Sequence, residues 1–146
     1  MKRRQWALIT VMALFAAGAM VVPRSAPAQG SLLKVSYRNL AMQCVWVTLY
    51  RRVDANLIKP SGWEIVKEGG LEPQMVRPYK SVEGTIDKPR GIRMRNQIMY
   101  TCSGGGGHAT HDTHFTEDPL SNVGFAEFTL HQNMHRNSYY ISGSFH

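Results

Sequence analysis

The sequence predicts an all-β protein, folded as a small antiparallel β-sandwich with one disulfide. Three observations lead to this prediction. Apolar and β-branched residues recur with a period of two far more often than with the helical period of about 3.6. Clusters of glycine and proline separate the short apolar runs. Two cysteines stand far apart in the chain, as expected for a bridge between distant strands.

The N-terminal segment has the three parts of an export signal. Residues 2–4 are basic, residues 6–22 are uncharged and apolar, and residues 26–28 are small at the two positions that a signal peptidase reads. We expect cleavage after Ala28, which leaves one domain over residues 29–146. The alternative is a retained membrane anchor, which the short apolar run disfavours because the bilayer core is about 30 Å thick. We therefore expect an exported protein, periplasmic or extracellular, that does not span the membrane after signal removal.

Short strands are expected wherever β-branched and aromatic residues alternate between turn signals. The first clear run, residues 44–50, is apolar on both faces, which is typical of a central strand. The run at 92–102 alternates between apolar and polar residues. The full set of expected strands is 33–37, 44–50, 63–68, 82–86, 92–102, 123–130 and 139–141. Roughly seven strands in one domain make the sandwich immunoglobulin-like in size.

The two cysteines, Cys44 and Cys102, are expected to form a disulfide, because an even pair in an oxidising compartment is most simply bridged. Cys102 has the same strand parity as Ile92, Met94 and Ile98, so we expect the bridge on the buried face of its strand. A redox or metal thiol is disfavoured, since neither cysteine has a second thiol at a C-x-x-C spacing.

Charge disfavours a nucleic-acid partner. The whole chain has a formal net charge of +7, but cleavage of the signal removes four basic residues and more than halves that excess. The clearest remaining basic pair is Arg93 and Arg95, which are two apart in an expected strand and so share an exposed face. These two arginines are candidate ligand contacts, although a solvated strand face is the simpler interpretation.

Histidines are concentrated in the C-terminal third, where all six of them lie between positions 108 and 146. His108, His111 and His114 recur every third residue after four glycines, so an extended loop would place their imidazoles along one side, where Zn²⁺ or Cu²⁺ binds. Further ligands are available from three other residues: Asp112, His131 and His135. The competing interpretation is an unliganded Gly/His-rich loop over residues 103–121, because this spacing has no fixed structural context.

No motif indicates catalysis. The sequence contains no G-x-S-x-G elbow, and the disulfide would consume both thiols. We therefore favour an exported, non-catalytic binding or interaction module for an unknown protein or carbohydrate, with metal binding as the alternative and a small secreted hydrolase as the weakest hypothesis. Tyr139 and Tyr140 are candidate contacts, and as strand neighbours one ring should face inward and the other outward.

Overall fold

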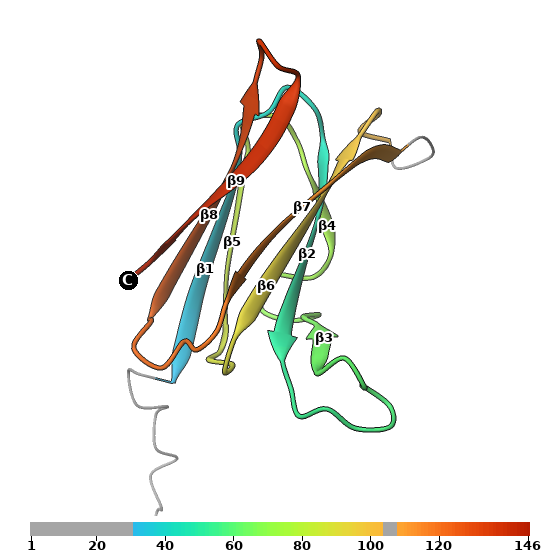
Figure 1. The fold of residues 1–146 in the computed structure, drawn as a ribbon. Coiled ribbons are helices and arrows are strands. Elements are labelled where there is room, and N and C mark those ends of the chain that lie inside the picture. Colours follow the sequence, from blue (N-terminus) through green and yellow to red (C-terminus); the bar gives the residue numbers. More distant parts are fainter. Residues whose placement is uncertain (1–30, 104–107) are drawn as a thin grey trace, which may run out of the picture.

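Residues 31–103 and 108–146 are described by the computed structural model, and they form two β-sheets packed face to face (Figure 1). This part of the chain contains no helix, and therefore none that is long and apolar enough to cross a membrane. Nine strands occur within it: β1 (Leu32–Asn39), β2 (Val45–Arg52), β3 (Trp63–Ile65), β4 (Gln74–Val76), β5 (Ser81–Asp87), β6 (Ile92–Met99), β7 (His108–Glu117), β8 (Phe125–Asn133) and β9 (Ser138–Phe145). The prediction of an all-β sandwich is confirmed.

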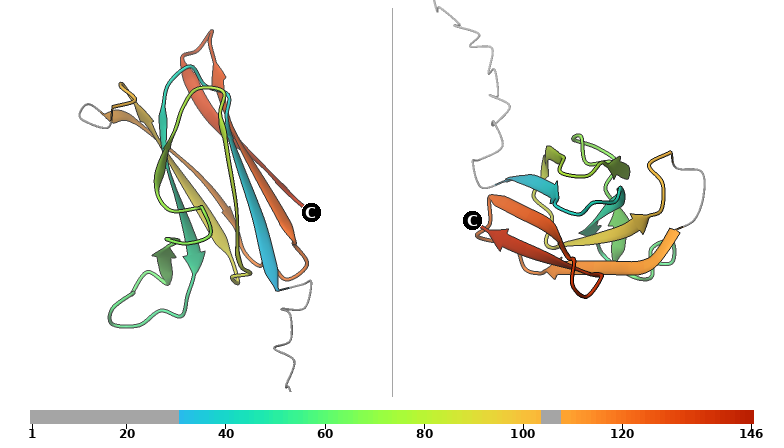
Figure 2. Two further views of the ribbon diagram at one scale, coloured as in Figure 1. Left: turned by 180° about the vertical axis from the view of Figure 1, so that it is seen from behind. Right: turned by 90° about the horizontal axis from the view of Figure 1, so that it is seen from above.

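The four-stranded sheet has the order β5-β1-β8-β9. Its pairs are antiparallel except for β1 and β8, which run parallel with Lys34 opposite Phe125 and Arg38 opposite Thr129. The first strand therefore lies in the interior of this sheet, between two strands that come later in the chain. Figure 2 shows this sheet from behind and from above, with β8 between β1 and β9.

The five-stranded sheet has the order β3-β2-β6-β7, and β4 joins it by pairing with β2. β3 pairs with the end of β2 around Arg51, whereas β4 pairs with its start around Trp46, so the two short strands share one edge of β2. β6 pairs with β2 along nearly its whole length, and all of these pairs are antiparallel. The β2 and β6 pairing thus forms the centre of this sheet.

A hydrophobic core fills the space between the sheets because apolar residues alternate along their central strands. In β1, for example, Leu33 and Val35 are fully buried while Lys34 is exposed. The largest fully buried side chains come from both sheets and the segments that join them: Tyr37, Phe128, Leu33, Leu49, Ile92, Met94, Ile98, Leu120 and Leu130. Burial of each such aliphatic or aromatic side chain contributes about 1.5–3 kcal/mol to folding.

One buried polar residue holds the two sheets together at the end of β1. Asn39 is fully buried, and its amide nitrogen donates to the carbonyl oxygens of Gln43 at 2.8 Å and Val76 at 3.1 Å. Its side-chain oxygen accepts a hydrogen bond from the Ala41 backbone amide at 2.9 Å. Asn39 therefore fixes the β1–β2 turn against β4, with its amide hydrogen bonds satisfied as burial requires.

The strand positions agree with the sequence in seven places and differ in two. The short β4 was not expected, and the expected loop over residues 103–121 is wrong for residues 108–117, which form β7. The glycines and histidines of this segment indicated a loop, whereas its threonines and Phe115 have strand propensity. Residues 108–117 form a strand because they pair with the edge of β6. This long-range contact cannot be read from the local composition.

The disulfide between Cys44 and Cys102 is confirmed, with the two Cα atoms 5.3 Å apart. Its expected position on the buried face of a strand is wrong for one partner. Cys44 is buried, but β6 ends at Met99, so Cys102 lies in the following turn and is exposed, as is Tyr100. The bridge therefore ties the turn after β6 to the start of β2.

Candidate functional site: an apolar loop tip

The loop that joins β2 to β3, residues 53–62, projects from one end of the sandwich (Figure 1). At its far end lie Leu57 and Ile58, two residues with exposed fractions of 102% and 88%. We call these two residues the apolar tip. Scattered exposed apolar side chains are common on protein surfaces. Two adjacent, almost fully exposed aliphatic side chains at the end of a projecting loop are a more specific feature, because nothing in the described fold shields them.

The apolar tip lies on a turn whose backbone is fixed by Asn56. The side-chain oxygen of Asn56 accepts hydrogen bonds from the backbone amides of Ile58 and Lys59, both at 2.8 Å. The Asn56 backbone amide donates in return to the Lys59 carbonyl oxygen at 3.2 Å. An asparagine side chain that reaches its own backbone in this way closes a turn without using its carbonyl group. Leu57 and Ile58 are thereby the two central residues of a closed turn.

The base of the loop is closed by further backbone hydrogen bonds. The Val53 amide donates to the Gly62 carbonyl oxygen at 2.9 Å, and the Gly62 amide donates to the Lys59 carbonyl oxygen at 3.1 Å. Gly62 has a φ of +72°, a left-handed conformation that a residue without a Cβ adopts at no steric cost. The loop is therefore a closed structure from its base to its tip.

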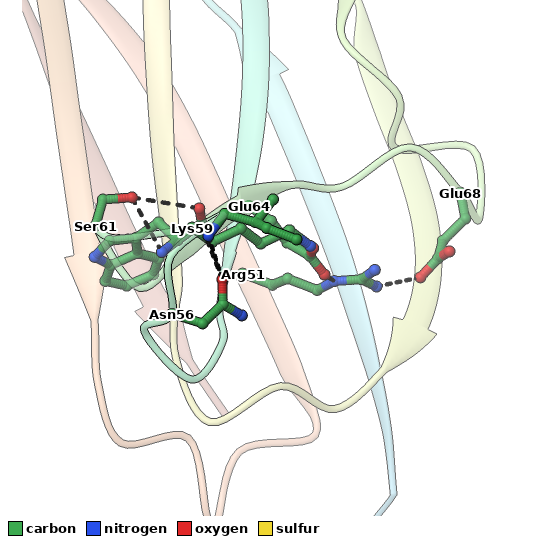
Figure 3. Close-up of polar contacts among 8 residues, drawn as sticks. Arg51, Asn56, Lys59, Ser61, Glu64 and Glu68 are labelled. Carbon is green, nitrogen blue, oxygen red and sulfur yellow. Dashed lines mark hydrogen bonds and ion pairs between the residues drawn. The ribbon is translucent and has the colours of Figure 1, made fainter.

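Ion pairs anchor the loop to the adjoining strands. Figure 3 shows Arg51 between Glu64 and Glu68, with Lys59 also paired to Glu64. On the other side of the loop, Asp54 accepts a hydrogen bond from the Arg90 guanidinium at 2.7 Å. The two charged residues of the loop, Asp54 and Lys59, are thus each paired with a residue outside it. The loop presents its apolar tip with its own charges locally balanced.

The arrangement is suited to contact with a partner surface. Transfer of one aliphatic side chain of this size from water into an apolar environment contributes about 1.5–3 kcal/mol. Because the turn is already closed, little backbone entropy is lost when it meets a partner. The protruding shape selects a partner that is concave or deformable.

The predicted metal ligands do not form a cluster among the described residues, in which no group of three or more His, Cys, Asp or Glu side chains converges. His131 lies on β8, where its ring bonds the Ser142 hydroxyl at 2.9 Å, and His135 lies exposed in the β8–β9 turn. The side chains of the other four candidates lie outside the described part of the structure: His108, His111, Asp112 and His114. The backbone of these four residues belongs to β7, in place of the expected extended loop.

The predicted ligand contacts lie on different surfaces. Arg93 and Arg95 belong to β6, where Arg93 is half-buried with its guanidinium 5.9 Å from the ring centre of Tyr50. Tyr139 packs against the core, whereas Tyr140 is 55% exposed on the opposite sheet from the arginines. One tyrosine faces inward and the other outward, as expected, but the four residues do not form one site.

Sequence reasoning missed the apolar tip, although a signal was present. The segment 56–60 reads Asn-Leu-Ile-Lys-Pro, in which two large aliphatic residues stand between residues that favour turns. Turn segments are usually polar, so an aliphatic pair in one is unusual. From sequence alone, a short apolar run in a turn is easily mistaken for the end of a buried strand. The exposure of Leu57 and Ile58 in the structure shows that this run belongs to a turn.

No protein-family model matches the sequence, and no curated protein matches it. Among solved structures, the membrane-binding domain of pneumolysin is similar, with a TM-score of 0.50 and 5% identity over 77% of this chain and 96% of that chain. The cytotoxin suilysin from Streptococcus suis has a TM-score of 0.45 and 14% identity over 77% of this chain. The human-specific toxin intermedilysin has a TM-score of 0.45 and 7% identity over 76% of this chain. This chain spans 23% of the length of each of these two toxins, and the likeness to the pneumolysin domain shows the fold alone.

Proposed function

We propose that the protein is an exported, non-catalytic binding module that docks on a lipid membrane surface through its apolar tip. The observation that carries this proposal is the nearly complete exposure of Leu57 and Ile58 on a turn closed by Asn56. A disulfide is typical of proteins outside the reducing cytoplasm, which supports export to the periplasm or the extracellular space. The similar fold of a domain described as membrane-binding agrees with a lipid partner.

A lipid surface fits the shape and the energetics of the tip. A bilayer interface is deformable, so a protruding pair of side chains enters it without a matching pocket. Insertion of both side chains contributes about 3–6 kcal/mol, twice the value for one aliphatic side chain. Anchoring of this size is weak and reversible, in the range where a second contact is needed for stable attachment.

The paired charges around the tip predict which lipids a vesicle must contain for the protein to bind. Asp54 is paired with Arg90, and Lys59 with Glu64, so the loop itself carries no excess positive charge. We therefore expect binding to zwitterionic phosphatidylcholine vesicles, with little dependence on anionic lipid or on salt. This behaviour differs from that of polybasic segments, whose binding requires anionic lipid and weakens as salt is added.

The test is flotation of the mature protein with phosphatidylcholine vesicles, compared with a variant that carries Leu57→Ser and Ile58→Ser. We expect the double substitution to lower the partition coefficient at least tenfold. The matched control is Met134→Ser, which removes another exposed apolar side chain, 63% exposed in the β8–β9 turn, and should leave binding unchanged.

A second variant reports the depth of the tip directly. In Leu57→Trp, the emission of the new indole should shift to shorter wavelength when vesicles are added. Absence of vesicle binding by the unmodified protein would overturn the proposal and direct the search to a protein partner of the tip. Equal binding by the double variant would equally exclude the tip as the contact.

A further inference from the structure

The outer face of the four-stranded sheet carries a second, independent feature. Every second residue of β1, β8 and β9 points away from the core, and the strand register aligns these residues in rows. One row places Ser36 beside Glu127 and Glu127 beside Ser144. The next row places Arg38 beside Thr129 and Thr129 beside Ser142. The two rows therefore bring four hydroxyl groups and one guanidinium onto adjoining positions of a single surface.

These two rows line a shallow depression with a volume of about 340 Å³. Its polar lining includes Ser36, Arg38, Glu127, Thr129, Ser142 and Ser144. Each hydroxyl can donate one hydrogen bond and accept others, so a ligand rich in hydroxyl groups finds matching partners here. Two of the hydroxyls are already oriented, because Ser142 bonds the ring of His131 at 2.9 Å and Ser144 bonds the ring of His146 at 2.8 Å.

Aromatic rings stand at both ends of this depression. At one end the rings of His131 and Tyr140 stack across β8 and β9, with centroids 4.6 Å apart and an interplanar angle of 9°. At the other end the rings of Phe125 and His146 stack with centroids 5.9 Å apart. Phe125 and His131 are six residues apart on β8, a distance of about 20 Å at the rise of a strand. The two ring pairs therefore flank the depression along β8, and a chain of several sugar units that lies across the depression can reach both.

Arg38 is the cation and Glu127 the carboxylate among the residues that line the depression. Glu127 contacts the ring of His146 at 3.3 Å, and outside the depression Glu83 is paired with Lys34 at 3.5 Å. Arg38 is exposed beside the hydroxyls and makes no ion pair with any residue in the described part of the chain. A guanidinium binds a carboxylate through two parallel hydrogen bonds. A ligand carboxylate that enters the depression can therefore pair with Arg38.

We infer that this outer face binds an acidic oligosaccharide, a chain of sugar units of which at least one carries a carboxylate. The chain lies along β8. Its carboxylate pairs with Arg38, its hydroxyl groups exchange hydrogen bonds with the serines and Thr129, and the C–H face of a sugar ring packs on Tyr140. A solvated sheet face is ordinarily polar. Here the hydroxyls and the Arg38 guanidinium line one depression, and ring pairs flank it along β8, which general polarity does not require.

The test is an array of immobilised oligosaccharides in which uronate-bearing and sialylated chains stand beside their neutral parents. We expect the mature protein to be retained by carboxylated chains and at least tenfold less by the neutral ones. Arg38→Gln should abolish this discrimination, whereas Arg77→Gln, which removes another exposed arginine that does not line the depression, should preserve it. Thermal unfolding of each variant verifies that its fold is intact.

Tyr140→Ala tests the ring contact in the same assay. It should weaken retention of carboxylated and neutral chains alike, and Tyr100→Ala, which removes a ring that is 69% exposed in the turn after β6, serves as its control. Failure of every carboxylated chain to retain the protein would refute the inference, as would unchanged retention of both Arg38→Gln and Tyr140→Ala. The Leu57→Ser, Ile58→Ser variant should keep its glycan binding, so the outcome is independent of the membrane proposal.

Discussion

Gly84 and Gly69 lie in backbone contact, and a Cβ on Gly84 would lie 2.2 Å from the carbonyl oxygen of Gly69. Gly69 has a φ of +71° and accepts a hydrogen bond from the Thr85 amide at 3.3 Å. The segment between β3 and β4 therefore lies directly against β5, and Leu71 from the same segment enters the core. This contact covers the side of the sandwich at the β5 edge.

Gly84→Ala should consequently destabilise the protein, because the new methyl group meets backbone that has little room to move. A Cβ at this position would also lie 2.5 Å from a side-chain carbon of Leu71. We expect a loss of about 3 kcal/mol in the free energy of unfolding, at the upper end of overpacking costs. Urea denaturation measures it. Gly124→Ala is the control, since its nearest atom would be 3.9 Å away, and a similar loss there would contradict the explanation.

Tyr37→Phe is expected to raise stability. Tyr37 is 2% exposed, and its hydroxyl has no hydrogen-bond partner among the described residues. Burial raises the pKa of the Tyr37 phenol far above its usual value, so the hydroxyl remains neutral in the folded protein. Removal of an unpartnered buried hydroxyl should add about 1 kcal/mol to the free energy of unfolding. A clear loss of stability in chemical denaturation would indicate a hydrogen bond to a buried water.

Removal of the disulfide should cost much of the protein's stability. Cys44 and Cys102 are 58 residues apart in sequence, and for a closed loop of this length the chain-entropy model gives about 4 kcal/mol. The double substitution Cys44→Ala, Cys102→Ala should lower the urea midpoint without loss of the β-sheet signal at low denaturant. Reduced unmodified protein should unfold at a similar midpoint, and a large difference between the two would assign the loss to packing of the cysteine side chains.

Metal binding, the alternative function in the sequence analysis, can be tested directly. The three-residue spacing of His108, His111 and His114 suits an extended loop better than β7, because a strand repeats every two residues. We therefore expect no stoichiometric Zn²⁺ or Cu²⁺ in elemental analysis and titration of the mature protein at neutral pH. A bound equivalent that disappears when the three histidines are replaced by alanine would reverse this expectation and establish a metal site.

The fold could be predicted from the sequence wherever local patterning and burial coincide. β1 and β6 show the alternation that their buried faces require, and the cysteine pair indicated the bridge. β4 and β7 depend on pairing with strands distant in sequence, which their composition does not encode. The depression on the outer face of the four-stranded sheet could not be predicted for the same reason. Arg38 and Ser142 come together only through the parallel pairing of β1 with β8 and the pairing of β8 with β9. From that surface the sequence indicated Tyr140 as a ligand contact and His131 as a metal ligand, but not the depression.

That parallel pairing also has a consequence for biogenesis. β1 is made among the first strands, yet one of its edges is filled by β8, which is synthesised near the end of the chain. A ribosome or an export channel that releases the chain from its N-terminus therefore presents β1 with an open edge until almost all of the protein has emerged. Open edges invite pairing with other chains. Completion of this sheet must therefore wait until β8 has emerged, and a holding chaperone would suppress aggregation during that interval.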